Sequence, residues 1–184
     1  MQFGRALVTL AALAVCGVAA FPAEPEIRFT STPAPGTTEL DPNHVPDSVC
    51  VSMQPAHGPN EPKKTDPPYV VTVSSRKVSK GDTVRVVVKG LASETFKGIY
   101  IQGRINDLPV GRWLPHDNPQ VRVLDCSPRK ENALSFVSRN GINSITLEWV
   151  APEDVKGDLI FLTTIVKSYD AFWTKVRSTP LQVL

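Results

Sequence analysis

Histidine, cysteine and long apolar runs are all scarce in this 184-residue chain, and the first scarcity bears directly on catalysis. The three histidines, His44, His57 and His116, lie in proline-rich or turn-like surroundings, outside any His-Glu-x-x-His motif. The sequence also lacks a Gly-x-Ser-x-Gly motif and a glycine loop that could cradle phosphate. We therefore expect a protein that is not an enzyme, with no catalytic residues and no cofactor.

A single extended apolar run opens the chain, from Ala6 to Ala20, after a lone charge at Arg5. A basic start, a short apolar middle and small residues at the exit are typical of a secretory signal peptide. The run is shorter than the roughly 18 apolar residues that a membrane-spanning helix needs, and no later stretch approaches that length. We expect residues 1–20 to be removed and the mature protein to be secreted, extracellular and without a membrane span.

The few cysteines point to one disulfide bond. Cys16 would leave with the signal peptide, and an oxidising compartment would join the remaining pair, Cys50 and Cys126. Two free thiols are the alternative. One cysteine pair is too little for a structural zinc site, which needs four ligands. Met53 and His57 carry groups that suit copper, but two such ligands do not make a site, so we expect no metal.

Net charge is close to balance, because 20 Lys and Arg residues face 18 Asp and Glu residues. Such a balance gives no reason to expect a nucleic-acid partner. The prolines are unevenly placed, with eleven of the 17 between residues 21 and 68. A proline-rich segment with few apolar residues buries too little surface to offset its ordering entropy, so we expect residues 21–47 to form a disordered leader. The stretch after Cys50 is expected to cross the domain surface as ordered coil.

From residue 69 onward the chain reads as short strands separated by turns. Residues 83–89 and 98–105 alternate apolar and polar side chains, which is typical of half-buried strands. The expected strands are 69–74, 83–89, 98–105, 110–114, 121–124, 133–137, 145–149, 159–166 and 179–184. Regularly spaced short strands, with no helical period sustained over ten residues, predict an all-β fold, an antiparallel β-sandwich or barrel.

The largest apolar area lies between residues 143 and 173. Ile145, Leu147 and Trp149 alternate with polar residues, as in a strand with one buried face. Residues 159–166, read LIFLTTIV, are apolar on both faces, which fits a central strand covered on both sides. We expect the core to form here and to include the aromatic residues Trp149, Tyr169, Phe172 and Trp173.

Several segments support a family resemblance. They are Cys50-Val-Ser-Met-Gln-Pro-Ala-His57, Pro68-Tyr69, the turn at Gly81, Phe96-Lys-Gly-Ile-Tyr-Ile-Gln-Gly-Arg104, Leu124-Asp-Cys126, Leu147-Glu-Trp-Val-Ala-Pro152, Phe161-Leu-Thr-Thr-Ile-Val166 and Tyr169-Asp-Ala-Phe-Trp173. Taken together and in this order, they resemble the reeler domain, which we expect over residues 48–184. The resemblance implies an immunoglobulin-like antiparallel β-sandwich of variant topology. Because Cys50 precedes the first strong strand, the disulfide is expected to pin the leading segment to a sheet.

Reeler domains occur in reelin, in F-spondin, in ferric-chelate-reductase-like membrane proteins and in small secreted insect defence proteins of the noduler type. A lone domain after a signal peptide resembles the last group most. That resemblance implies a monomeric innate-immune protein that binds microbial surface molecules, such as the polyanions lipopolysaccharide and lipoteichoic acid or the polysaccharide β-glucan. It also implies an antibacterial role that includes haemocyte aggregation. The alternative is an extracellular-matrix adhesion module that binds heparin-like glycosaminoglycan.

Anionic ligands of either kind would be bound by basic side chains. Arg85 and Lys89 share the outward side of one expected strand, and Tyr100, Gln102 and Arg104 share the outward side of the next. We therefore expect these five residues to form the ligand-binding face. The alternative contact is stacking of sugar rings on exposed aromatic residues such as Tyr100 or Trp113.

Overall fold

The computed structural model describes residues 46–184, in which one short helix precedes a series of strands. The helix is α1 (Asp47–Ser52), and a single 3-10 turn, η1 (Leu91–Ser93), follows the third strand. The strands are β1 (Tyr69–Val73), β2 (Lys77–Val78), β3 (Thr83–Gly90), β4 (Phe96–Ile105), β5 (Leu108–Pro109), β6 (Arg112–Trp113), β7 (Val121–Cys126), β8 (Arg129–Ile142), β9 (Ser144–Val150), β10 (Gly157–Ser168), β11 (Ala171–Arg177) and β12 (Leu181–Val183).

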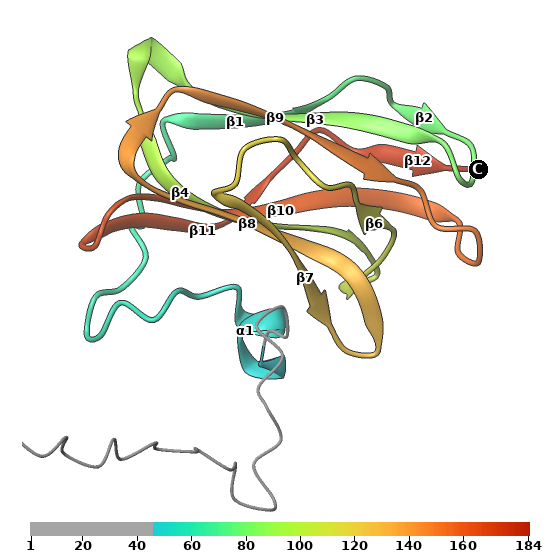
Figure 1. Ribbon diagram of the computed structural model, residues 1–184, viewed down its shortest axis with the longest axis horizontal. Helices are drawn as coiled ribbons and strands as arrows, with labels where there is room; N and C mark the ends of the chain where they lie inside the picture. Colours follow the sequence, from blue (N-terminus) through green and yellow to red (C-terminus); the bar gives the residue numbers. More distant parts are fainter. Residues whose placement is uncertain (1–45) are drawn as a thin grey trace, which may run out of the picture. The chain divides into compact units, whose positions relative to one another are not determined.

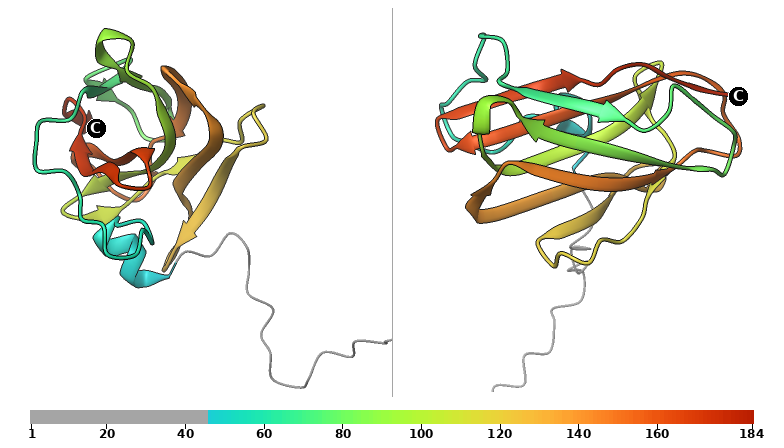
Figure 2. Two further views of the ribbon diagram at one scale, coloured as in Figure 1. Left: turned by 90° about the vertical axis from the view of Figure 1, so that its left-hand side faces the viewer. Right: turned by 90° about the horizontal axis from the view of Figure 1, so that it is seen from above.

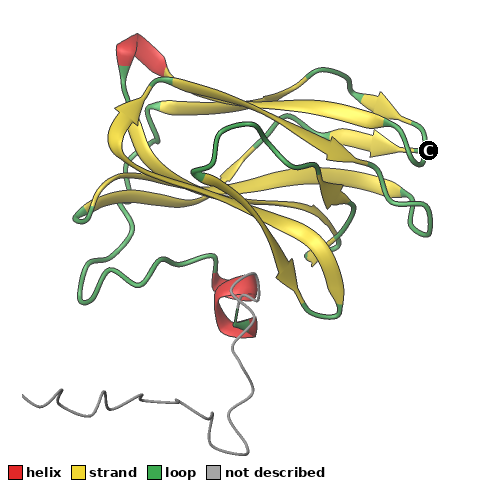
Figure 3. Ribbon diagram, viewed as in Figure 1, coloured by secondary structure: helices red, strands yellow, loops and turns green. Residues whose placement is uncertain are grey.

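The strands form two sheets that face each other as a sandwich (Figure 1). One sheet has the order β1-β3-β9-β6, and the other runs β2-β12-β10-β4-β8-β7, with β11 paired to β10 and β5 to β4. Neighbouring strands are antiparallel except β12 and β2, which are parallel. Figure 2 shows the twist of both sheets, and Figure 3 shows how little helix the fold contains. The all-β sandwich expected from the sequence is confirmed.

Alternation along the strands places the core between the two sheets. Val84, Val86 and Val88 of β3 are buried, and the alternating apolar residues of β9 lie opposite them in register. Trp149 packs edge-on against Phe161 of the facing sheet, with the ring centroids 5.2 Å apart. Trp113 packs against the same ring and is fully buried, so the expectation that it offers an exposed aromatic surface is wrong.

Strand β10 lies inside the eight-stranded sheet, between β4 and the two shorter strands β11 and β12. Its residues 161–165 are all buried, as the apolar run on both faces predicted. Phe172 and Trp173 are also buried, whereas Tyr169 is 59% exposed. Tyr169 lies in the turn between β10 and β11, where its ring reaches the surface beside His57, so its assignment to the core is wrong.

Helix α1 and the coil that follows it cover part of the outer face of the eight-stranded sheet (Figure 1). The Cys50–Cys126 disulfide fixes α1 to the end of β7. Further along, the Thr164 hydroxyl of β10 donates to the Met53 carbonyl at 2.5 Å, and the Lys63 amide donates to the Phe172 carbonyl at 2.8 Å. The disulfide and the ordered surface coil are therefore confirmed. Helix α1 itself was not expected.

The expected signal peptide, residues 1–20, lies outside the described residues, as does nearly all of the expected leader. At the end of that leader, Asp47 already belongs to α1. Within residues 46–184, no helix is long and apolar enough to cross a membrane.

Candidate functional site

The five residues expected to form one basic face lie in two different sheets. Arg85 and Lys89 are exposed on β3 of the four-stranded sheet, whereas Tyr100, Gln102 and Arg104 belong to β4 of the eight-stranded sheet. The chain passes from one sheet to the other through η1, so β3 and β4 follow one another in sequence but are not neighbours. The expectation of a single face shared by Arg85, Lys89 and Arg104 is therefore wrong.

Gln102 and Arg104 are also not solvent-exposed, since they retain 0% and 8% of their accessible surface. They point away from the sandwich interior, as their alternation predicted, but they lie beneath the α1 segment. Arg104 Nε donates to Gln102 Oε1 at 2.8 Å, and the guanidinium also donates to the Cys50 carbonyl. Gln102 Nε2 donates to the Tyr100 hydroxyl at 2.8 Å and contacts Cys126 Sγ at 3.1 Å. These side chains therefore anchor α1, and they are unavailable to a surface polyanion.

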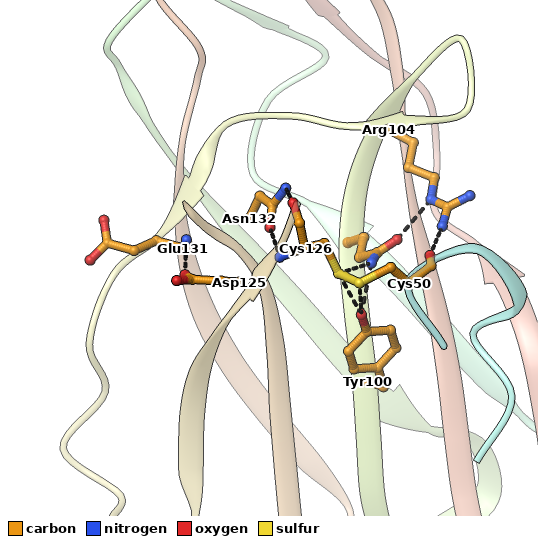
Figure 4. Close-up of a disulfide and its surroundings, with 8 residues drawn as sticks. Cys50, Tyr100, Arg104, Asp125, Cys126, Glu131 and Asn132 are labelled. Carbon is orange, nitrogen blue, oxygen red and sulfur yellow. Dashed lines mark hydrogen bonds between the residues drawn. A yellow bond between two sulfur atoms is a disulfide. The ribbon is translucent and has the colours of Figure 1, made fainter. Parts of the chain in front are cut away.

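Figure 4 shows Tyr100 and Arg104 both pointing at the disulfide region. The Tyr100 hydroxyl lies 3.1 Å from Cys126 Sγ. Burial lowers the pKa of Arg104, and the nearby Asp107 and Tyr100 oppose that shift. Burial also disfavours the charged form of Tyr100 and so raises the pKa of Tyr100 to about 12, although hydrogen bonding from Gln102 acts in the opposite direction. In the other sheet, burial and the charge of Glu94 raise the pKa of Tyr69 to about 12.

These two raised pKa values predict a loss of stability in alkali. An unfolded tyrosine ionises at about pH 10, so between about pH 10 and pH 12 the unfolded chain releases protons that the folded chain keeps. The free energy of unfolding should therefore be insensitive to these groups below about pH 10 and should fall as pH rises toward 12. Denaturant unfolding across this range, together with ultraviolet titration of tyrosinate, tests the expectation. In Tyr100→Phe the fall should be smaller, and an unchanged fall would show that Tyr100 ionises normally.

The exposed basic residues of the four-stranded sheet do not form a concentrated site. Arg85 lies opposite Glu148 in the β3–β9 register, which places a carboxylate beside it. Elsewhere on the surface, Arg129 is engaged in an ion pair with Asp154, at 2.6 Å. The face that carries Arg85 and Lys89 is therefore a weak candidate for polyanion binding.

A more basic surface lies at the open seam between β1 and β11, which are edge strands of different sheets. A cleft of about 600 Å³ runs along this seam. Lys63, Lys175 and Arg177 line it, together with hydroxyl-bearing residues such as Thr65 and Thr174, and no Asp or Glu of the described chain is among its lining residues. Such a combination of cations and hydroxyl groups suits phosphate-bearing or sulfate-bearing sugars.

The backbone of β11 helps to shape this cleft. Thr174 and Lys175 together oppose one residue of β10, because the register shifts between the Trp173 and Val176 pairings. Lys175 has a φ of 55°, in the left-handed region that side chains other than glycine rarely adopt. A β-bulge of this kind bends a strand and redirects a side chain, and such bulges are common beside functional sites. The same bulge interrupts the alternation of residues 171–177, so the sequence pattern gave little sign of β11.

A second hollow, an apolar groove of about 390 Å³, lies on the outer face of the eight-stranded sheet beside α1. Tyr100 lines it, together with Met53 and His57 from the covering segment. The His57 ring packs against Tyr169 and Phe172, with centroids 4.8 Å and 5.0 Å away. Across residues 46–184, no group of three or more His, Cys, Asp or Glu residues could hold a metal ion.

The two-sheet sandwich, with a short helix disulfide-bonded to the outside of one sheet, defines an all-β sandwich module. The particular family follows from the sequence. Residues 48–184 match the family described as Reeler domain, and the chain belongs to that family.

Curated relatives cover most of the chain. "Putative defense protein 3" of Antheraea mylitta is 35% identical over 148 residues, which are 80% of this chain and 89% of that protein. "Putative defense protein" of Locusta migratoria is 36% identical over 138 residues, 73% of this chain and 76% of that protein. Among solved structures, the human F-spondin reeler domain superposes with a TM-score of 0.55 at 14% identity, covering 68% of this chain and 94% of the other. At that identity the likeness concerns the fold alone.

Proposed function

We propose that this protein is a secreted, non-enzymatic defence protein that binds microbial surface polyanions, such as lipopolysaccharide and lipoteichoic acid, and thereby promotes an antibacterial response that includes haemocyte aggregation. The observation that supports the binding role is the cleft between β1 and β11, which Lys63, Lys175 and Arg177 line without a neighbouring carboxylate in the lining. The defence role is supported by relatives that are named as defence proteins and that align with this chain over most of their own length.

Charge distribution within the cleft indicates which residues contribute most. Arg177 also borders a smaller pocket that contains Asp107 and Asp158, so part of its charge is balanced there. Lys63 and Lys175 are both exposed and engage in no ion pair shorter than 4 Å within residues 46–184, although the charge of Lys63 acts on the nearby Asp170. Their ammonium groups would meet ligand phosphates at the surface, where pairing is favourable but screened by salt over about 8 Å at physiological ionic strength.

The test is a double substitution, Lys63→Ser with Lys175→Asn, because asparagine tolerates the left-handed backbone at position 175. Two exposed ion pairs contribute up to about 1 kcal/mol each, so binding to lipopolysaccharide should weaken by up to about thirtyfold. Binding of the parent should also weaken as salt rises. The melting temperature should stay nearly constant, since exposed charges contribute within about 0.5 kcal/mol to stability. Surface plasmon resonance on immobilised lipopolysaccharide and lipoteichoic acid measures how the substitutions and the salt concentration change binding.

The matched control is Arg85→Ser with Lys89→Ser, which removes the same charge from the four-stranded sheet. It should bind like the parent. If the control loses binding while the cleft variant does not, the polyanion site is the β3 face. Heparin and neutral β-glucan serve as comparison ligands. Tighter binding to heparin than to the microbial polymers would favour matrix adhesion over defence.

A further inference from the structure

The apolar groove beside α1 lies on the outer face of the eight-stranded sheet. Its wall comes from α1 and the residues that follow, and its floor comes from β4, β8 and β10. The lining residues that present apolar surface include Val49, Met53, Pro55, Val137, Val166 and Tyr169. Two of these are among the most exposed large apolar residues of the described chain, since Val137 is 72% exposed and Tyr169 59%. Exposed apolar surface gathered in a groove marks a binding site more often than isolated apolar residues do.

Two features keep this groove open. Gly98 of β4 leaves its floor without a side chain, and a Cβ there would lie 3.5 Å from the Val166 Cβ, at ordinary van der Waals distance. The wall is held in place because the disulfide fixes Cys50 and the Thr164 hydroxyl binds the Met53 carbonyl. These contacts preform the groove, as is usual for small-molecule sites, and its volume lies in the usual range of about 300–1,000 Å³.

The polar groups around the groove favour an anionic head. Lys97 lines it and is exposed, and three serines, Ser135, Ser138 and Ser168, offer hydroxyl groups. Asp and Glu are absent from the lining residues of this part of the chain. The buried Nδ1 of His57, a further lining residue, has no hydrogen-bond partner within residues 46–184.

We propose that this groove binds one fatty-acyl chain of a microbial envelope amphiphile, with a phosphate of the same molecule beside Lys97. The proposal rests on the proposed function, because the acyl chain would belong to the same lipopolysaccharide or lipoteichoic acid whose polyanionic part binds in the β1–β11 cleft. The segment from α1 to β1 supplies walls to both sites, with Met53 and His57 at the groove and Lys63 and Thr65 at the cleft. An apolar groove of about 390 Å³ with one cation at its edge fits a single chain better than it fits a protein surface.

A fluorescent fatty acid, 11-(dansylamino)undecanoic acid, tests the site directly when it is used at concentrations too low to form micelles. The parent should bind it, and octanoate, decanoate and dodecanoate should displace it in increasing order. Each added methylene should tighten binding about fourfold until the groove is filled, as expected for apolar surface leaving water. Displacement that does not depend on chain length would overturn the proposal.

Two substitutions change the groove without removing a buried side chain. Gly98→Leu fills the floor, and Val137→Asp places a carboxylate on it at an exposed position. Each should weaken binding of the fluorescent acid at least tenfold. The matched control is Leu108→Asp, which makes the same kind of change at a residue 66% exposed on β5, outside the groove. In Lys97→Gln, dodecanoate should lose its advantage over dodecanol. Unchanged melting temperatures show that the variants fold, and unchanged binding in Gly98→Leu and Val137→Asp would overturn the groove assignment.

Intact and deacylated lipoteichoic acid separate this inference from the proposed function. The groove variants should weaken binding of the intact polymer and leave binding of the deacylated polymer unchanged, whereas the cleft variant should weaken both. If groove variants bind the intact polymer as the parent does, the acyl-chain proposal fails while polyanion binding stands. If the cleft variant binds deacylated polymer normally, the proposed function fails independently. A parent dimer that Val137→Asp dissociates, seen by light scattering, would assign the groove to a second copy and overturn the proposal.

Discussion

Replacing Trp149 with alanine is expected to lower the free energy of unfolding by about 3–5 kcal/mol, the usual cost of truncating a fully buried large aromatic residue. Trp149 is fully buried on β9, where its ring packs edge-on against Phe161 of the opposite sheet. Its indole Nε1 also donates to the Val110 carbonyl at 3.2 Å. The substitution would therefore remove contacts with both sheets and leave the Val110 carbonyl without this donor.

The backbone around this ring leaves little opportunity to close the resulting cavity. Gly111, with a φ of 67°, approaches so closely that a Cβ there would lie 2.2 Å from Trp149 Cζ2. Because the turn at Gly111 is shaped to the ring, it cannot move into the space left by alanine without changing its own conformation. Guanidinium chloride unfolding followed by circular dichroism measures the loss. Leu108→Ala, at an exposed apolar residue, is the control and should change stability by less than about 0.5 kcal/mol. A cost for Trp149→Ala below about 1 kcal/mol would show that the core repacks.

The sequence predicted those parts of the fold in which one physical signal dominates. Residues 83–89 alternate because β3 has one buried and one exposed face, so a pattern of period two is sufficient to identify it. Residues 159–166 lack alternation because β10 is covered on both faces, and the length of the run with its β-branched residues identified a central strand. The disulfide could be predicted because only two cysteines follow the expected signal peptide, which leaves one pairing.

Elements without such a signal were missed or misplaced. Helix α1 has six residues, too few to display a helical period, and it is held by the disulfide rather than by its own propensity. Strand β11 is interrupted at Lys175, where the bulge breaks its alternation. Strand β8 continues to Ile142, well beyond the expected end at residue 137. The added stretch is polar and has no buried residue, so no alternation of apolar and polar side chains marks it as a strand.

The candidate site was harder to predict than the fold because it depends on which surfaces come together. Alternation correctly placed Gln102 and Arg104 on the outer side of β4, but it could not show that α1 covers that side. Nothing in the spacing of Arg85 and Arg104 reveals that β3 and β4 belong to different sheets. Lys63 and Lys175 are more than a hundred positions apart, and only the packing of β1 near β11 brings them to one cleft. The two basic residues Lys175 and Arg177, close together in the sequence, were the available signal.

Removing the disulfide, with Cys50→Ala and Cys126→Ala together, should destabilise the protein by about 4 kcal/mol. The two cysteines are 76 positions apart, and in the chain-entropy model a bond that closes a long loop restricts the unfolded state strongly. The folded protein would also lose its covalent attachment of α1. A six-residue helix is too short to persist alone, so its remaining anchors, the Arg104 and Thr164 hydrogen bonds, would have to hold it.

The two ends of the bond should respond differently, which makes the prediction specific. Cys126 is held by Asn132, which accepts from its amide at 2.7 Å and donates to its carbonyl at 2.8 Å. The amide of residue 126 should therefore stay protected from hydrogen exchange. The amide of Met53, which caps α1 and donates to the Val49 carbonyl, should exchange much faster than in the parent. Hydrogen exchange measured by mass spectrometry resolves the two segments, and denaturant unfolding gives the global loss. Because α1 supplies a wall of the apolar groove, the variant should also bind the fluorescent fatty acid more weakly. Protection of α1 equal to that of the parent would mean that packing alone positions the helix, and the disulfide would then contribute only through the unfolded chain.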